Sequence, residues 1–209
     1  MSIVKKILLI SGGLFVLMII ICILYIFIPR KDLKIVIDSS EIIPYLADGD
    51  IILRKSNAGW ADIFSRFSLT DRRFSHLGIV RIHNGNITVI NSVGHISDSE
   101  EGVHEVSLEG FLRVAISIGV FRSKYIDGTL ISDKAVEYLG LPFDWDFDIN
   151  DGSKIYCTEL LYAVLNSVAP EYNLETRYMD IINMEIIPLD SVSASENFEE
   201  ILYLVLPLQ

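Results

Sequence analysis

Cysteine and positive charge are both scarce in this chain of 209 residues. The only two cysteines are Cys22 and Cys157, and because Cys157 alone lies beyond the apolar N-terminal run, no disulfide framework can form in the rest of the chain. Residues 35–209 contain 12 Lys and Arg against 27 Asp and Glu, a formal net charge of −15 compared with −11 for the whole chain. That acidity argues against binding to nucleic acid and against tight docking on anionic lipid heads.

An uncharged run near the N-terminus accounts for much of the 51% hydrophobic content. Residues 7–28 contain no charged side chain, and at about 1.5 Å per helical residue they are long enough to cross a hydrocarbon core of roughly 30 Å. The run continues into Pro29 without a small-residue cleavage site, so we expect a retained transmembrane helix in which Cys22 is an ordinary apolar position. The chain then divides into a membrane anchor, residues 1–32, and one domain, residues 33–209.

Basic residues flank both ends of the expected span, so charge alone does not fix its orientation. They are Lys5 and Lys6 on one side and Arg30, Lys31 and Lys34 on the other. A short basic N-terminus before a single retained span commonly stays in the cytoplasm. We therefore expect a single-pass protein of the cell membrane whose domain lies on the extracytoplasmic side.

The clearest local signal in the domain is a β-hairpin. Two β-branched runs, residues 76–83 and 86–93, are joined by Asn84-Gly85, the dipeptide that favours a type I′ turn. Further strands are predicted at residues 50–54, 103–108, 113–121 and 201–206, with a linker or first strand at 33–38. Helices are predicted at residues 133–139, with Ser132 as N-cap and Gly140 after the end, at 157–168, ended by Pro170, and as a short helix or ordered loop at 60–67. One antiparallel sheet with helices packed on it gives an α+β domain.

Cys157 begins the helix predicted at residues 157–168 and lies on its apolar stripe. Leu161, Val164, Leu165 and Val168 follow at helical spacing, so the cysteine should face the sheet. A buried free cysteine is often only a small apolar residue. The start of a helix also favours a thiolate, because the free N–H groups and the helix dipole lower a cysteine pKa below about 8.5 and can bind an oxyanion. The cysteine alone leaves both interpretations open.

A nucleophilic thiol needs a base, and the register of the hairpin points to His76. With a two-residue loop, Gly78 faces Asn91 and His76 faces Val93, so His76 and Asn91 are diagonal neighbours on one face. An Asn91 oxygen that accepts from one ring nitrogen would fix the tautomer and direct the other nitrogen outward. That is the role of the third member in a Cys/His/Asn triad.

The other three histidines are weaker candidates for a role in the catalytic site. His95 is also a diagonal neighbour of His76 and is the alternative for the orienting role. His83 lies beside the hairpin turn, so we expect it to be a solvated turn residue. His104 alternates with apolar residues, so we expect it to be an exposed strand residue.

Five segments of the domain, read together, resemble a known family. They are DGDIILR (48–54), FSHLGIV (74–80), VINSVG (89–94), LGLPFDWDFD (139–148) and YCTELLY (156–162). In this order they resemble the YiiX/YaeF-type permuted papain-like cysteine hydrolases of the NlpC/P60 superfamily. The resemblance implies a circularly permuted papain-like fold with the motif histidine and cysteine at His76 and Cys157. The third polar residue, commonly a glutamate, falls on Asn91, which can orient the ring but cannot add a negative charge.

We expect no metal and no other cofactor. The aspartates of FDWDFDINDG lack the order, glycine and closing glutamate of an EF-hand, and we interpret them as loop and cleft-rim carboxylates. They are Asp144, Asp146, Asp148 and Asp151. A zinc site that includes Cys157 and His76 lacks any CxxC or HxxxH spacing.

These observations predict a membrane-anchored cysteine hydrolase, amidase- or peptidase-like, that acts on an amide or ester through a thioester acyl-enzyme. The resemblance implies two substrate classes, because the superfamily includes enzymes that cut cell-wall peptides and related permuted members move acyl groups on lipids. A thiol acyltransferase or lipid hydrolase on the same fold is one alternative. A non-catalytic membrane-tethered binding module is the other.

Overall fold

The computed structural model describes residues 13–21, 24, 36–57, 59–94, 101–180 and 183–206 of the chain. Residues 13–21 are helical. Within this described part, no helix combines the length and the apolar character needed to cross a membrane. The expected transmembrane helix, residues 7–28, falls largely outside it, as do Cys22 and His95.

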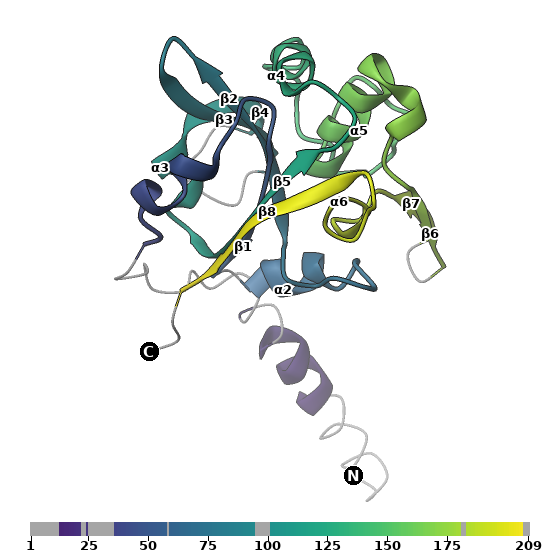
Figure 1. Cartoon of the computed structure of the whole chain (residues 1–209). Coiled ribbons are helices and arrows are strands. Elements are labelled where there is room, and N and C mark those ends of the chain that lie inside the picture. The colour runs from purple at the N-terminus through teal and green to yellow at the C-terminus, as the bar shows by residue number, and fades with distance from the viewer. Residues whose placement is uncertain are drawn as a thin grey trace, which may run out of the picture.

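The described residues form an antiparallel sheet of six strands in the order β4-β3-β2-β1-β5-β8 (Figure 1). These strands are β1 (Ile51–Ser56), β2 (His76–His83), β3 (Asn86–Val93), β4 (Gly102–Ser107), β5 (Ala115–Ser123) and β8 (Phe198–Val205). Two further short strands pair with each other, β6 (Arg177–Met179) and β7 (Met184–Ile186). Of the two expectations for residues 33–38, a linker or a first strand, the described residues 36–38 form no strand, and Asp38 caps a 3₁₀ turn.

Helices pack on both faces of this sheet, which confirms the expected α+β class. They are α2 (Gly59–Ser65), α3 (Leu108–Leu112), α4 (Gly128–Val136), α5 (Cys157–Val168) and α6 (Asp190–Ser193), with 3₁₀ turns η1 (Ser39–Glu41), η2 (Ile43–Tyr45) and η3 (Pro170–Tyr172). Helix α5 has the predicted limits, and its start and its end before Pro170 are as expected.

The two faces of the sheet are covered by different helices, α5 on one side and α3 on the other (Figure 1). One core contains Leu53, Leu77 and Ile79 of the sheet with Leu161 and Val164 of α5. The other contains Ile52 and Val80 of the sheet with Leu108 and Phe111 of α3. Successive side chains of a strand point to opposite faces, so odd and even residues of β2 belong to different cores.

The hairpin turn forms as predicted, but the pairing of β2 with β3 stops early. Asn84 and Gly85 have φ of 51° and 79°, as a type I′ turn requires, and Val80 pairs with Val89. The paired register ends at Ile79 and Ile90, so the expected pairs beyond them are not part of the ladder.

The segment before α5 occupies the place where that ladder ends. Ser92 of β3 donates a 2.6 Å hydrogen bond from its hydroxyl to the Ile155 carbonyl, which joins the strand to this segment. The first residues of β2 still pair with β1, where His76 lies opposite Arg54. The two hairpin strands therefore separate at the end that carries His76.

Helix α4 begins earlier than the sequence indicated. Asp127, and not Ser132, is its N-cap, and the Asp127 carboxylate accepts from the Thr129 N–H at 3.0 Å. Ser132 is buried within the helix and donates to Asp48 Oδ2 at 2.8 Å. Gly128 is the first residue of the helix, where glycine has a low helix propensity, but here a tertiary contact requires it.

Gly128 touches the loop before β1 through its backbone. A Cβ atom built on Gly128 would lie 1.9 Å from the Asp48 carbonyl oxygen, and one on Gly49 would lie 2.0 Å from the Gly128 oxygen. Gly49 also has a φ of +75°, which side chains rarely adopt. The two glycines allow α4 to dock directly on this loop.

We expect Gly128→Ala to destabilise the domain by about 1–3 kcal/mol, because the added methyl group cannot fit without backbone movement. Urea denaturation of the purified protein would measure this as a lower midpoint. Gly152→Ala is the matched control, since a Cβ there meets nothing within 4 Å. Equal midpoints for the two variants would show that the Gly49–Gly128 contact is not tight.

Candidate active site

Cys157 is the first residue of α5, and hydrogen bonds hold the chain on both sides of it. Glu159 Oε2 accepts from the Tyr156 backbone N–H at 3.2 Å, as part of a capping box. Thr158 Oγ1 donates to the Ile187 carbonyl at 2.6 Å, and the Ile187 N–H donates to the Tyr156 hydroxyl at 3.0 Å. The start of α5 is therefore anchored, and its thiol is only partly exposed.

The contact expected between His76 and Asn91 is present. His76 Nε2 and Asn91 Oδ1 are 2.9 Å apart, and the two residues are only 5% and 2% exposed. A carboxamide oxygen can only accept, so the hydrogen lies on Nε2. In the neutral ring Nδ1 then carries a lone pair and can take a proton.

His76 and Cys157 do not share one face of the sheet, contrary to the expectation from the sequence. The His76 ring stacks on Phe111 of α3 with 5.7 Å between ring centroids, whereas Cys157 packs with the core under α5. The thiol instead meets β2 at the end of the strand where the pairing with β3 has stopped. There the backbone N–H of Leu77, the residue after His76, interacts with the sulfur. Within the described residues the thiol makes no direct hydrogen bond to the ring.

Arg54 lies opposite His76 on β1 and adds a buried positive charge to the site. The guanidinium carbon lies 4.4 Å from the centre of the Phe111 ring, and Nη1 donates to the Phe111 carbonyl. Arg54 is 8% exposed, its Nε has no hydrogen-bond partner, and no described carboxylate lies within ion-pair distance. Burial lowers the pKa of Arg54 to about 10, so the side chain is still a cation at neutral pH.

Burial keeps both the thiol and the imidazole neutral. Loss of contact with water raises the pKa of Cys157 to about 11, against the opposing effect of the Leu77 and Thr158 N–H groups and the Arg54 charge. Burial first, and then the Arg54 charge, lower the pKa of His76 to about 3, against the hydrogen bond that the ring donates to Asn91. The expected low thiol pKa is therefore wrong. The helix N–H groups act in the predicted direction, but the desolvation of the thiolate is larger.

Glu159 follows Cys157 on the first turn of α5 and is also withdrawn from water. Burial, with added repulsion from Asp144, Asp148 and Asp151, raises the pKa of Glu159 to about 8. The side chain is thus largely protonated at neutral pH. It places little negative charge beside the sulfur, where a carboxylate would oppose formation of a thiolate.

The aspartates of the loop before α5 fold that loop, as expected. Asp144 is fully buried and accepts from the N–H groups of Asp146 and Asp148 at 2.9 and 2.7 Å. Lys154 forms ion pairs with Asp146 and, at 3.5 Å, with Asp151. These carboxylates are occupied by partners within the loop.

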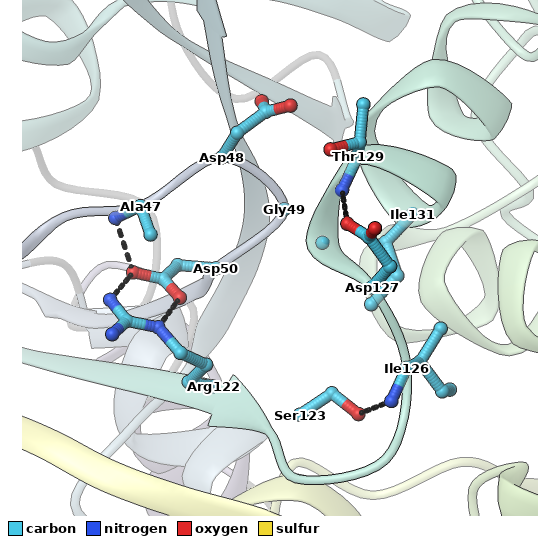
Figure 2. A pocket seen from close by; sticks show the side chains of 11 residues that line it. Ala47, Asp48, Gly49, Asp50, Arg122, Ser123, Ile126, Asp127, Thr129 and Ile131 are labelled. Atoms are coloured by element: carbon cyan, nitrogen blue, oxygen red, sulfur yellow. Dashed lines mark hydrogen bonds and ion pairs between the residues drawn. The ribbon is translucent and has the colours of Figure 1, made fainter.

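A cavity of about 330 Å³ lies away from Cys157, between the loop before β1 and the start of α4. Figure 2 shows hydrogen bonds and ion pairs between several of the residues that line it. Asp50 binds Arg122 at 2.7 and 2.8 Å and accepts from the Ala47 N–H at 2.7 Å, while Asp127 caps α4. These contacts make the cavity part of the framework that holds α4.

The structure adds residues to the site that the sequence did not single out. Arg54 ends an apolar run and gave no signal beyond being a charge at an inward-facing strand position. His104 was expected to be exposed, but it is half-buried, and its Nε2 is buried without a hydrogen-bond partner. His83 is exposed beside the turn, as expected. His95 lies outside the described residues, so its alternative role stays untested.

A solved structure resembles this chain in fold. It is the yiiX protein from Escherichia coli O157:H7, described as a metalloprotein, with 18% sequence identity and a TM-score of 0.61, over 74% of this chain and 96% of that one. The described residues contain no group of three or more His, Cys, Asp or Glu that could hold a metal ion. They do not fit such a site.

No curated protein matches this chain. A family model described as permuted papain-like amidase, YaeF/YiiX, C92 family, matches residues 45–184, which is about two thirds of the chain and includes Arg54, His76, Asn91 and Cys157. The chain therefore belongs to the YaeF/YiiX family of permuted papain-like amidases.

Proposed function

We propose that this protein is a membrane-anchored cysteine amidase or peptidase in which Cys157, His76 and Asn91 form the catalytic triad. The observation that carries the proposal is the buried contact between His76 Nε2 and Asn91 Oδ1, which leaves the Nδ1 lone pair free to take a proton. Cys157 begins α5, and its sulfur interacts with the backbone N–H of Leu77, the residue after His76.

The proposed reaction starts from a neutral thiol and a neutral imidazole. As the sulfur attacks the carbonyl carbon, His76 Nδ1 takes the thiol proton, and the backbone N–H of Cys157 donates to the developing oxyanion. The imidazolium then protonates the leaving amine or alcohol, which leaves a thioester on Cys157. Water resolves this thioester with His76 again as the base. In a thiol acyltransferase, an amine or alcohol would replace that water.

The helix at residues 13–21 supports the proposed anchor. Its residues from 14 to 21 are all large and apolar, and each is between 41% and 62% exposed. A helix that is apolar on every side and covered by no other part of the domain suits a bilayer better than water. We propose a single span with the domain on the extracytoplasmic side, where a cell-wall peptide or a lipid would supply the amide or ester.

A trapped acyl-enzyme tests the triad directly. Full-length protein in detergent is incubated with 4-nitrophenyl acetate and 4-nitrophenyl palmitate, and the adduct is mapped by mass spectrometry. We expect the acyl mass on Cys157 and none on the Cys157→Ala variant. His76→Ala should lower the acylation rate by roughly 10²–10⁴-fold, because the thiol loses its base.

A Cys22→Ser background serves as the control, since it removes the other thiol without touching the site. A preference for the long acyl chain would favour a lipid substrate over a peptide. An unmodified Cys157 with both esters would contradict the hydrolase and favour the binding module.

The pH dependence of alkylation tests the resting protonation state. With a thiol pKa of about 11 and an imidazole pKa of about 3, the thiolate fraction rises only as the pH approaches 11, without a step near neutral pH. Labelling of the Cys22→Ser protein with iodoacetamide should therefore still accelerate above pH 9. A rate that is already constant below pH 8 would show a thiolate–imidazolium pair instead.

Arg54 provides a further test of the electrostatics. Loss of its charge in Arg54→Gln should raise the thiol pKa further and also raise the imidazole pKa, because the cation favours the thiolate and opposes the imidazolium. The alkylation curve should then move to higher pH, while Arg54→Lys should stay near the wild-type curve. Circular dichroism checks that both variants fold, and superimposable curves for folded Gln and Lys variants would contradict the charge effect.

A further inference from the structure

The orientation of the Asn91 carboxamide decides whether His76 can act as a base. With Oδ1 toward the ring, Nε2 carries the hydrogen and Nδ1 is free to accept a proton. If the amide turned by half a rotation, Nδ2 would donate to Nε2 and the hydrogen would move to Nδ1. His76 could then not accept the thiol proton. An asparagine therefore needs a second contact that fixes which end faces the histidine.

No described residue makes that second contact directly. Asn91 Nδ2 is buried and has no hydrogen-bond partner among the described residues, although Asn91 itself is only 2% exposed. Buried donors in native proteins are nearly always satisfied, by protein or by an ordered water, because an unmade hydrogen bond costs free energy. The amide nitrogen thus calls for an acceptor on its side of the sheet.

His104 lies where that acceptor is needed. It is the direct cross-strand partner of Asn91 in the pairing of β3 with β4, so the two side chains share one face. Directly opposed residues have Cβ atoms about 4.5–5.5 Å apart. His104 Nε2 is also buried without a partner. Arg54 Nε, another buried atom of this face without a partner, is only a donor and cannot serve.

We propose that His104 is a positioning residue, whose Nε2 accepts a hydrogen bond from one buried water that in turn accepts from Asn91 Nδ2. This contact holds Asn91 with its oxygen toward His76. His76 on β2, Asn91 on β3 and His104 on β4 then form a row of side chains that fixes the tautomer of His76. This tautomer allows His76 to take the proton of Cys157. The inference deepens the proposed function, since the tautomer matters only if His76 is the base.

The test uses full-length protein with ¹⁵N-labelled histidine, and NMR reads the His76 tautomer from its ring nitrogens. Wild-type protein should show the Nε2–H form alone. His104→Phe and His104→Leu offer Nδ2 no acceptor and should show a mixture of both tautomers. The turnover number for the 4-nitrophenyl ester should fall in proportion to the lost Nε2–H form, with KM unchanged. His104→Gln, whose carboxamide oxygen can accept, should restore both.

His83→Gln is the matched control, because it changes an exposed histidine of the neighbouring hairpin and should alter neither readout. A folded Phe or Leu variant with the wild-type tautomer would overturn the proposal. If neither apolar variant folds, a His104→Gln protein that folds but has lost the Nε2–H form would also overturn it. The NMR readout does not depend on turnover, so a tautomer shift in a protein that fails to acylate would reject the hydrolase and keep the positioning role.

Discussion

The separation of β2 from β3 beyond Ile79 and Ile90 is the feature on which the site depends. In an unbroken ladder, the N–H of Leu77 would be available to β3. Because the hydrogen-bonded pairing has stopped there, this N–H instead interacts with the sulfur of Cys157, and Ser92 bonds to the Ile155 carbonyl. A cysteine that packs under α5 thereby meets the strand that carries His76, whose ring lies on the face under α3.

Desolvation controls the electrostatics of this site more than the helix dipole does. The N–H groups at the start of α5 and the Arg54 cation both favour a thiolate, yet burial raises the pKa of Cys157 to about 11. The same burial keeps His76 neutral, so its Nδ1 lone pair is free to take a proton, while the lowered pKa makes the ring a weaker base than a solvated imidazole. Charge then develops only when the substrate carbonyl accepts the sulfur, and the groups that stabilise it are already in place. Asn91 suits this arrangement, because a neutral amide leaves Arg54 without a carboxylate to neutralise it.

Local patterns predicted the parts of the fold that local geometry determines. The Asn84-Gly85 turn set the register that brought His76 and Asn91 together, and a single apolar stripe gave the limits of α5. The start of α4 was missed because Gly128 is explained only by its contact with a distant loop. The thiol pKa was mispredicted for the same kind of reason, since burial is a property of the packed domain. His104 could not be recognised because its role depends on an unpaired atom of its neighbour.

The acidity of the domain bears on the role of the proposed anchor. A formal charge of −15 on residues 35–209 would keep a free domain away from anionic lipid heads rather than draw it to them. A tether would reverse that, because it fixes the effective concentration of the domain at the membrane whatever its charge. The repulsion would then act on orientation, turning the acidic surface away from the bilayer. An enzyme with a lipid substrate would need its site to face the membrane against this repulsion. For a peptide substrate, the same repulsion would favour an orientation in which the site faces away from the membrane. If Cys157 is acylated as proposed, the kind of acyl chain it accepts would thus also report on how the domain is oriented on the proposed anchor.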